Sequence, residues 1–282
     1  MPTTTLDGIE TYYEVHGSGS PVLMFAPGGF DATIDKWRAA SAWTGINAIE
    51  RLGAEHSLIL YDRRECGQSG GRVERLSWAS YTRQGKELLD HLKIDSAWIL
   101  GGCMGCSVAL AFGVHYPEAT RGLLLHWPVG GYRWKVNSQG RFQRHYSFAK
   151  EKGLTGIVER AQGGKSFWTD PESGPWSTAI ARDVAFADQF AAQDLERYLA
   201  MIITSGRSLF DRDTAGGAEP EEVMGVKAPA LIIPGDDPSH ATSGAHYLRE
   251  LLPRADFWSV MPPDQTTQKI CDRILEFCRE HD

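Results

Sequence analysis

Short runs of mostly apolar residues recur along the chain, and glycine or polar residues follow each of them. Such runs occupy 21–25, 57–61, 97–100, 122–125 and 230–233. Runs of this length without regular polar alternation are typical of strands that are buried on both faces. The pattern therefore predicts a set of parallel strands in the middle of a sheet.

Apolar residues at helical spacing lie between these runs, at 80–92 and 106–116, and again at 270–277. Alternating strands and helices favour a mostly parallel sheet with helices on both faces. The ends of the chain add two strand predictions. Asp7-Gly8 supplies the positive φ angles of a tight hairpin between two short strands within 3–15, and 257–260 is expected to form the last strand.

The strand–helix alternation stops between 129 and 223. This stretch has helical patches and many aromatic residues but no clear strand–helix–strand unit. We therefore expect an α/β core formed by residues 1–128 and 224–282, and an inserted helical cap formed by residues 129–223. The chain has no repeat of fixed period, and its one low-complexity segment, the short loop 215–220, is expected to mark the return from the cap to the sheet.

The strongest motif is Gly101-Gly102-Cys103-Met104-Gly105, which stands between a predicted strand and a predicted helix. A nucleophile at such a turn needs small residues two positions before and after it, because larger side chains would collide in so tight a bend. On this motif the chain resembles the α/β-hydrolase superfamily, with cysteine in place of the commoner serine. The resemblance implies the α/β-hydrolase fold and Cys103 as nucleophile; dienelactone hydrolases share the cysteine exchange only.

Two further segments support the resemblance. Residues 26–30 stand where the family has its oxyanion-hole loop, although no histidine precedes the glycines, and residues 62–69 are similar to its D-x-R-G-x-G-x-S stretch, with Glu65 in place of a glycine. The resemblance implies that the backbone N–H of Met104 and that of Gly29 or Phe30 hold a developing oxyanion.

The family's general base is missing from its usual place, since the loop 261–268 contains no histidine. Two histidines are candidates instead. His240 follows a strand and has Asp236 and Asp237 nearby, either of which could orient its ring. Of the two, we expect Asp237 to be the acid. His126 ends the strand 122–125, so it is expected at the same edge of the sheet. The acidic neighbours favour His240, and both remain open.

The five cysteines are odd in number and form no zinc-ligand pattern, so we expect no metal and no cofactor. Cys103 and Cys106 are formally a CxxC pair, but we expect Cys106 to lie in the core. A helix N-terminus favours the thiolate of Cys103. Since a cysteine needs a base less than a serine does, loss of the usual histidine is compatible with activity.

Aromatic residues are concentrated in and near the expected cap. We expect Trp127, Tyr132, Trp134 and Trp168 to line a substrate pocket for an aromatic or apolar small molecule. A net charge of −7 without a dense basic run gives no reason to expect binding to nucleic acid or to a membrane. The absence of a signal-like start or long apolar run leads us to expect a cytoplasmic protein.

Three functions follow from these residues. The first is hydrolysis of an ester, thioester, lactone or activated carbonyl compound by Cys103. The second is acyl transfer or a cofactor-free lyase reaction on the same fold, because without the usual histidine the activation of water is weakened. The third is a non-catalytic ligand-binding protein, because a fold does not fix a function.

Overall fold

The computed structural model describes residues 2–39, 43 and 47–282. Its central feature is one eight-stranded sheet in the order β1-β2-β4-β3-β5-β6-β7-β8. The pairs β1/β2 and β2/β4 are antiparallel, and all the other neighbouring strands are parallel. The strands are β1 Thr3–Leu6, β2 Ile9–His16, β3 Ser20–Phe25, β4 His56–Tyr61, β5 Ala97–Gly102, β6 Thr120–His126, β7 Ala230–Ile233 and β8 Ala255–Phe257.

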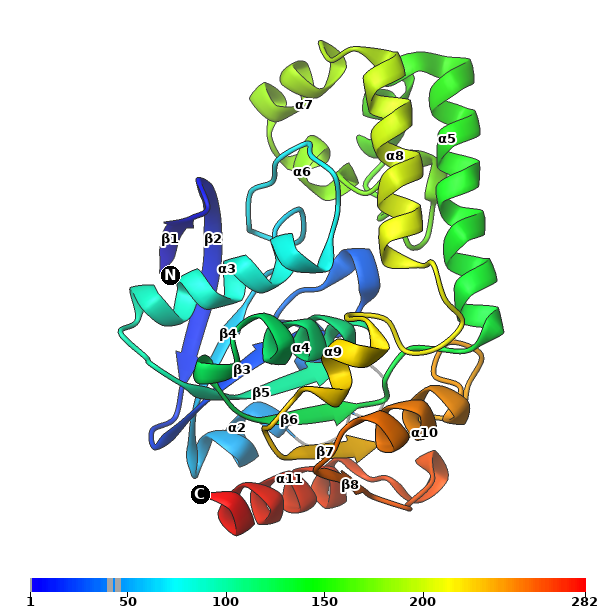
Figure 1. Ribbon diagram of the computed structural model, residues 1–282. Coiled ribbons are helices and arrows are strands. Elements are labelled where there is room, and N and C mark those ends of the chain that lie inside the picture. Colours follow the sequence, from blue (N-terminus) through cyan, green and yellow to red (C-terminus); the bar gives the residue numbers. More distant parts are fainter. Residues whose placement is uncertain (1, 40–42, 44–46) are drawn as a thin grey trace.

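The predicted fold class is confirmed, because the sheet is mostly parallel and helices cover both of its faces (Figure 1). Two apolar clusters fill these layers. One lies on the α3 and α4 side of the sheet and continues into the helices above it, and the other lies between the sheet and α2 and α11. The core helices are α1 Lys36–Ala39, α2 Ala48–Gly53, α3 Trp78–His91, α4 Met104–His115, α9 Pro220–Met224, α10 Thr242–Leu251 and α11 Thr267–His281.

The inserted segment between β6 and β7 is helical, and its helices stand together beyond one end of the sheet (Figure 1). These helices are α5 Tyr132–Ala161, α6 Ser177–Arg182, α7 Val184–Ala191 and α8 Leu195–Leu209. Helix α9 begins at Pro220, within the range expected for the cap, but it packs against α4 and α10 of the core.

Local predictions hold with small differences at the ends of elements. Asp7 and Gly8 have φ angles of 48° and 68°, so they form the expected hairpin turn. The helix expected to begin at 106 begins at Met104 instead, directly after the elbow. The last strand ends at Phe257 rather than continuing to 260, because the two prolines at 262 and 263 start a 3₁₀ turn soon after it.

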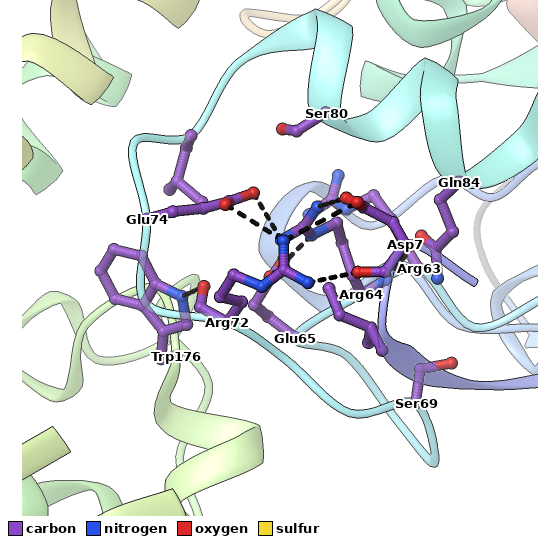
Figure 2. A network of polar contacts seen from close by, with 12 residues as sticks. Asp7, Arg63, Arg64, Glu65, Ser69, Arg72, Glu74, Ser80, Gln84 and Trp176 are labelled. Atoms are coloured by element: carbon purple, nitrogen blue, oxygen red, sulfur yellow. Dashed lines mark hydrogen bonds and ion pairs between the residues drawn. The ribbon is translucent and has the colours of Figure 1, made fainter. Parts of the chain in front are cut away.

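The segment after β4 is anchored by a buried cation, Arg64, whose side chain is 1% exposed. Its guanidinium contacts Glu65 at 2.9 Å, Glu74 at 2.7 Å and Asp7 at 3.3 Å, which joins this loop to the N-terminal hairpin (Figure 2). Glu65 itself has a φ angle of 68°, the conformation that favours the glycine usual at this position. The ion pair helps to offset that strain.

Replacing Arg64 tests this anchor. Arg64→Met should lower the free energy of unfolding by about 3–5 kcal/mol, because it leaves the buried carboxylate of Glu65 without its partner. Denaturant unfolding followed by circular dichroism measures the loss. The matched control is Arg72→Met, at a side chain that is 43% exposed on the rim of the same network, where a loss below about 1 kcal/mol is expected. Equal losses in the two variants would contradict the anchoring role.

Candidate active site

Cys103 occupies a strained turn between β5 and α4. Its φ and ψ angles are 55° and −125°, which a residue other than glycine rarely adopts. The flanking glycines are required by close backbone contacts: a Cβ on Gly101 would lie 2.4 Å from the carbonyl oxygen of Gly105, and one on Gly105 would lie 2.1 Å from that of Phe25. The turn therefore presents the Cys103 side chain at the end of the sheet, beside the loop that follows β3.

The two cysteines of the formal CxxC pair have different surroundings. Cys103 is partly exposed, whereas Cys106 is buried. The thiol of Cys106 donates to the carbonyl oxygens of Gly101, at 3.1 Å, and His126, at 3.2 Å. Burial raises the pKa of Cys106 well above its usual range. Cys106 thus behaves as a core thiol, and both cysteines are reduced in the structure.

His240 and Asp237 are paired within the loop that follows β7. Nδ1 of His240 lies 2.8 Å from Oδ2 of Asp237, while Oδ1 of the same carboxylate accepts the backbone N–H groups of Ser239 and His240 at 2.8 and 3.0 Å. A carboxylate held in this way fixes the orientation of the ring and directs Nε2 outward from the pair. Asp236, the other acid of the loop, is exposed.

Cys103 is the second group, besides Asp237, that stabilises the charged form of His240. Burial disfavours a charge on His240, yet its close interaction with Cys103, reinforced by Asp237, raises the pKa of His240 to about 9. Nε2 of His240 makes no hydrogen bond of standard geometry with any described residue, and its interaction with Cys103 is mainly electrostatic. The arrangement favours a charged His240 imidazolium at neutral pH.

His126 has a different environment from His240. It ends β6 with its side chain 2% exposed, and its ring centroid lies 4.7 Å from that of Trp43, in the apolar layer opposite the one that Cys103 packs against. Burial and the nearby charge of His240 lower its pKa to about 3. Its backbone carbonyl, rather than its ring, contacts the elbow, by accepting the N–H of Cys103 at 3.0 Å.

Backbone contacts hold the His240 loop against the end of β6. The N–H of Gly130 donates to the carbonyl oxygen of Ser239 at 3.1 Å, and Gly130 forms a bridge with His240. Thr242 closes the loop, because its hydroxyl donates to the carbonyl oxygen of Gly235 at 3.1 Å. The position of the imidazole is therefore set by several contacts besides Asp237.

Gln265 occupies the loop after the last strand, where the family resemblance leads one to expect a histidine. It is 6% exposed, and its Oε1 accepts the indole N–H of Trp127 at 2.6 Å. Its amide nitrogen donates to the carbonyl oxygens of Pro234 and Val260. The Trp127 ring lies 5.6 Å from that of His240. The sequence analysis considered this loop only for a histidine and missed Gln265, whose amide holds Trp127 beside His240.

The loop after β3 lies beside the elbow. Gly28 and Gly29 have φ angles of 113° and 61° and lead into a 3₁₀ turn over Gly29–Asp31. Asp62 fixes the end of this loop, since its carboxylate accepts the N–H groups of Ile34 and Gln68 at 2.8 and 2.7 Å. The first N–H groups of a helix have no partner within the helix, and that of Met104 is the first of α4. It stays a predicted oxyanion donor, together with the N–H of Gly29 or Phe30.

The aromatic residues expected at the pocket divide into two groups. Trp168 lies against the open side of Gly29, where a Cβ would be 3.2 Å from its ring, and Trp134 lies 5.7 Å from Trp168. Trp127 lies next to His240. Tyr132, by contrast, is 71% exposed and forms no ring contact with any other described side chain, so the structure does not bring it to this group.

One groove lies away from this group of residues. A groove of about 950 Å³ between α2 and α11 lies on the other face of the sheet, and its arginines are already paired, for example Arg51 with Asp272 and Arg279 with Glu55. No group of three potential metal ligands occurs within residues 2–39, 43 and 47–282. Over the same residues, no helix is both long and apolar enough to cross a membrane.

The sequence matches the α/β hydrolase fold family over residues 21–259, and the chain therefore belongs to that family. Among curated proteins, one from Azorhizobium caulinodans that carries the name carbamate hydrolase RutD is 30% identical over 125 residues. That match covers 44% of this chain and 43% of the relative, so less than half of the relative's length is spanned.

Solved structures show the same fold over the whole chain. A meta-cleavage product hydrolase from Pseudomonas fluorescens IP01, CumD, superposes with a TM-score of 0.65 at 18% identity and covers 100% of this chain and 98% of its own. An enol-lactonase from Burkholderia xenovorans LB400 gives 0.62 at 18% identity, with 99% and 100% covered. Together with the family match, these comparisons support an enzyme of the α/β-hydrolase type.

The coupling between Cys103 and His240 predicts a specific titration. In the wild-type protein the His240 ring should lose its proton near pH 9. In Cys103→Ala that pKa should fall, because the sulfur no longer favours the imidazolium while burial still opposes it. Two-dimensional ¹H–¹⁵N NMR of the histidine side chains measures both values.

His126 is the internal control, assigned by its loss in His126→Asn, and its ring should stay neutral through the whole range because its pKa is about 3. The raised pKa of His240 also predicts how the stability of the fold changes with pH. Its interactions contribute fully below its ordinary pKa of about 6.5 and are lost as the pH rises through about 9. A wild-type His240 pKa that Cys103→Ala leaves unaltered would exclude the coupling.

Proposed function

We propose that this protein is a small-molecule hydrolase in which Cys103 is the nucleophile, His240 is the general acid and base, and Asp237 orients His240. The observation that carries the proposal is the combination of a strained elbow at Cys103 with an imidazole whose pKa Cys103 itself raises. The 2.8 Å contact of that imidazole with Asp237 completes the set. The same three chemical roles are found in other cysteine hydrolases.

In the first half of the reaction, the thiolate of Cys103 attacks the carbonyl carbon of an ester, thioester or lactone. The carbonyl electron pair moves onto oxygen, where the N–H of Met104 and that of Gly29 or Phe30 stabilise the oxyanion. When the oxyanion collapses, the bond to the leaving group breaks, and the His240 imidazolium gives its Nε2 proton to that group. The products of this step are a Cys103 thioester and a free alcohol or thiol; a lactone keeps both in one molecule.

The second half releases the acyl group. Neutral His240 removes a proton from water, the resulting hydroxide attacks the thioester carbonyl, and the Cys103 thiolate leaves as the carboxylic acid forms. The proton returns the imidazole to its charged form, which restores the starting pair. His240 is placed in this scheme as the base that water activation requires.

The substrate class follows from the aromatic residues and the relatives. Trp134, Trp168 and Trp127 favour an apolar or aromatic group near the reacting carbonyl. The names carbamate hydrolase, enol-lactonase and meta-cleavage product hydrolase belong to the similar proteins, and they support carbonyl chemistry here. Residues 129–223 are proposed as the cap that covers the substrate. Acyl transfer and ligand binding without turnover are the alternatives that the tests below distinguish.

The nucleophile is tested by trapping its acyl form. Incubation with an aryl ester should give a mass increase equal to the acyl group, together with a burst of phenol, and Cys103→Ala should show neither. Cys106→Ala is the matched control at the neighbouring thiol and should keep most of the activity, because Cys106 bonds only to backbone carbonyls.

Turnover that survives in Cys103→Ala would exclude covalent catalysis. An adduct that is released only when an added alcohol or amine accepts the acyl group would establish a transferase instead. A ligand-dependent rise in melting temperature without any turnover would establish a binding protein.

The base is tested by comparing the two histidines. His240→Ala should lower kcat by roughly 10²- to 10⁴-fold, the usual range for general acid–base catalysis. His126→Ala should mainly lower stability, because its ring packs on Trp43 in the core. Steady-state kinetics and thermal unfolding are measured on both variants, and the reverse ranking of kcat values would assign the base to His126.

A further inference from the structure

Two polar atoms on the inner face of α5 are buried without a partner. Ser138 is 1% exposed. Within the described part of the chain, neither its hydroxyl nor the buried Nε of Arg141 makes a hydrogen bond. Residues three apart are neighbours on one helix face. A buried helical serine ordinarily bonds a carbonyl one turn earlier. Two such atoms side by side therefore indicate a place where a ligand supplies the missing acceptors.

Arg141 also lacks a counterion. Its Nη1 donates to the backbone carbonyl oxygen of Trp168, so the edge formed by Nε and Nη2 is left for a ligand. No carboxylate among the described residues forms an ion pair with it, and none of the seven remaining residues (1, 40–42 and 44–46) is acidic. Burial and the nearby charge of Arg144 lower the pKa of Arg141. The guanidinium is thus a partly desolvated cation without an anion.

Arg160 and Arg212 show the contrast within the same region. Arg160 pairs with Asp170 at 2.8 Å, and Arg212 pairs with Glu219 at 2.7 Å. Both are satisfied by acids of the chain itself. Other arginines of the inserted segment, such as Arg144 and Arg207, also form no ion pair among the described residues, but both are exposed, whereas Arg141 is partly buried. The partly desolvated charge of Arg141 is therefore available to a bound anion.

Arg141 is linked to the oxyanion loop through Trp168. The guanidinium carbon is 4.1 Å from the ring centroid of Trp168, and the same ring lies against Gly29 of the oxyanion loop. Trp168 and Cys103 pack against one continuous apolar cluster. A substrate that extends from the oxyanion loop past Trp168 would bring its far end to α5.

We propose that Ser138 and Arg141 bind a carboxylate of the substrate, so that the preferred substrates are half-esters, thioesters or lactones of short dicarboxylic acids. This inference rests on the proposed function. The planar Nε–Nη2 edge matches the two oxygens of a carboxylate, and the Ser138 hydroxyl adds a third donor. A phosphate is matched less well, because the next cation along the helix, Arg144, is exposed.

The kinetic test compares matched esters. Monoaryl esters of succinate, glutarate and adipate are assayed beside neutral aryl esters of the same acyl length, and the ratio of their kcat/KM values is the readout. The wild-type enzyme should favour one of the charged esters by at least 10-fold. Arg141→Met should lower that ratio 10- to 100-fold and Ser138→Ala should lower it several-fold. The control, Arg144→Met, removes an equal charge from an exposed position three residues further along α5 and should keep the ratio.

A ratio near one in the wild-type enzyme, or an equal fall in Arg141→Met and Arg144→Met, would overturn the carboxylate site. The proposed function would still stand as long as ester turnover depends on Cys103. An unchanged ratio in Ser138→Ala would remove that residue from the site.

An equilibrium measurement separates the two proposals. 5-Oxohexanoate, which has a carboxylate and no ester, is added to Cys103→Ala, and its neutral amide serves as control. A rise in melting temperature with the acid only, lost when Arg141→Met is added, supports the site even if no ester is hydrolysed, in which case the proposed function fails alone. No rise with the acid overturns the site.

Discussion

The turn between β5 and α4 is the constraint on which the rest of the site depends. Cys103 adopts an unfavourable backbone conformation there, and the neighbouring glycines allow the backbone of α4 to approach the end of β3. The same approach places the loop after β3 next to Cys103 and the start of α4. One local strain therefore fixes the relation of the proposed nucleophile to both proposed oxyanion donors.

The proposed base, His240, lies in a different loop from the one in which the family resemblance leads one to expect a histidine. Asp237 and His240 lie three residues apart in one loop, so a single short segment supplies both the acid and the imidazole. Backbone contacts with Gly130 and the hydroxyl of Thr242 hold that loop in place. Gln265 stands where the family resemblance leads one to expect the histidine, and it supports Trp127 beside the substitute. The contact between His240 and Asp237 therefore needs no second loop to supply the acid.

The helices above the sheet bring a different chemistry to the same place. Phe30 of the loop after β3 packs against Phe142 and Phe167 of the inserted segment, while Trp168 covers Gly29. Most of this contact is apolar, and apolar surroundings strengthen the interaction between Cys103 and His240. Within that apolar layer, the unpaired Arg141 is the exception on which the proposed preference for an anionic substrate depends.

The sequence by itself determined the features that are local in the chain. The apolar runs, the Asp7-Gly8 turn and the spacing of glycines around Cys103 predicted the sheet, the hairpin and the elbow, because each depends on residues only a few positions apart. Tertiary structure decided the rest. The side of the sheet that receives the ring of His126 depends on its contact with Trp43, far away in the sequence. Whether Arg141 finds an acid depends on how the segments of the inserted region pack, and no local pattern encodes either outcome.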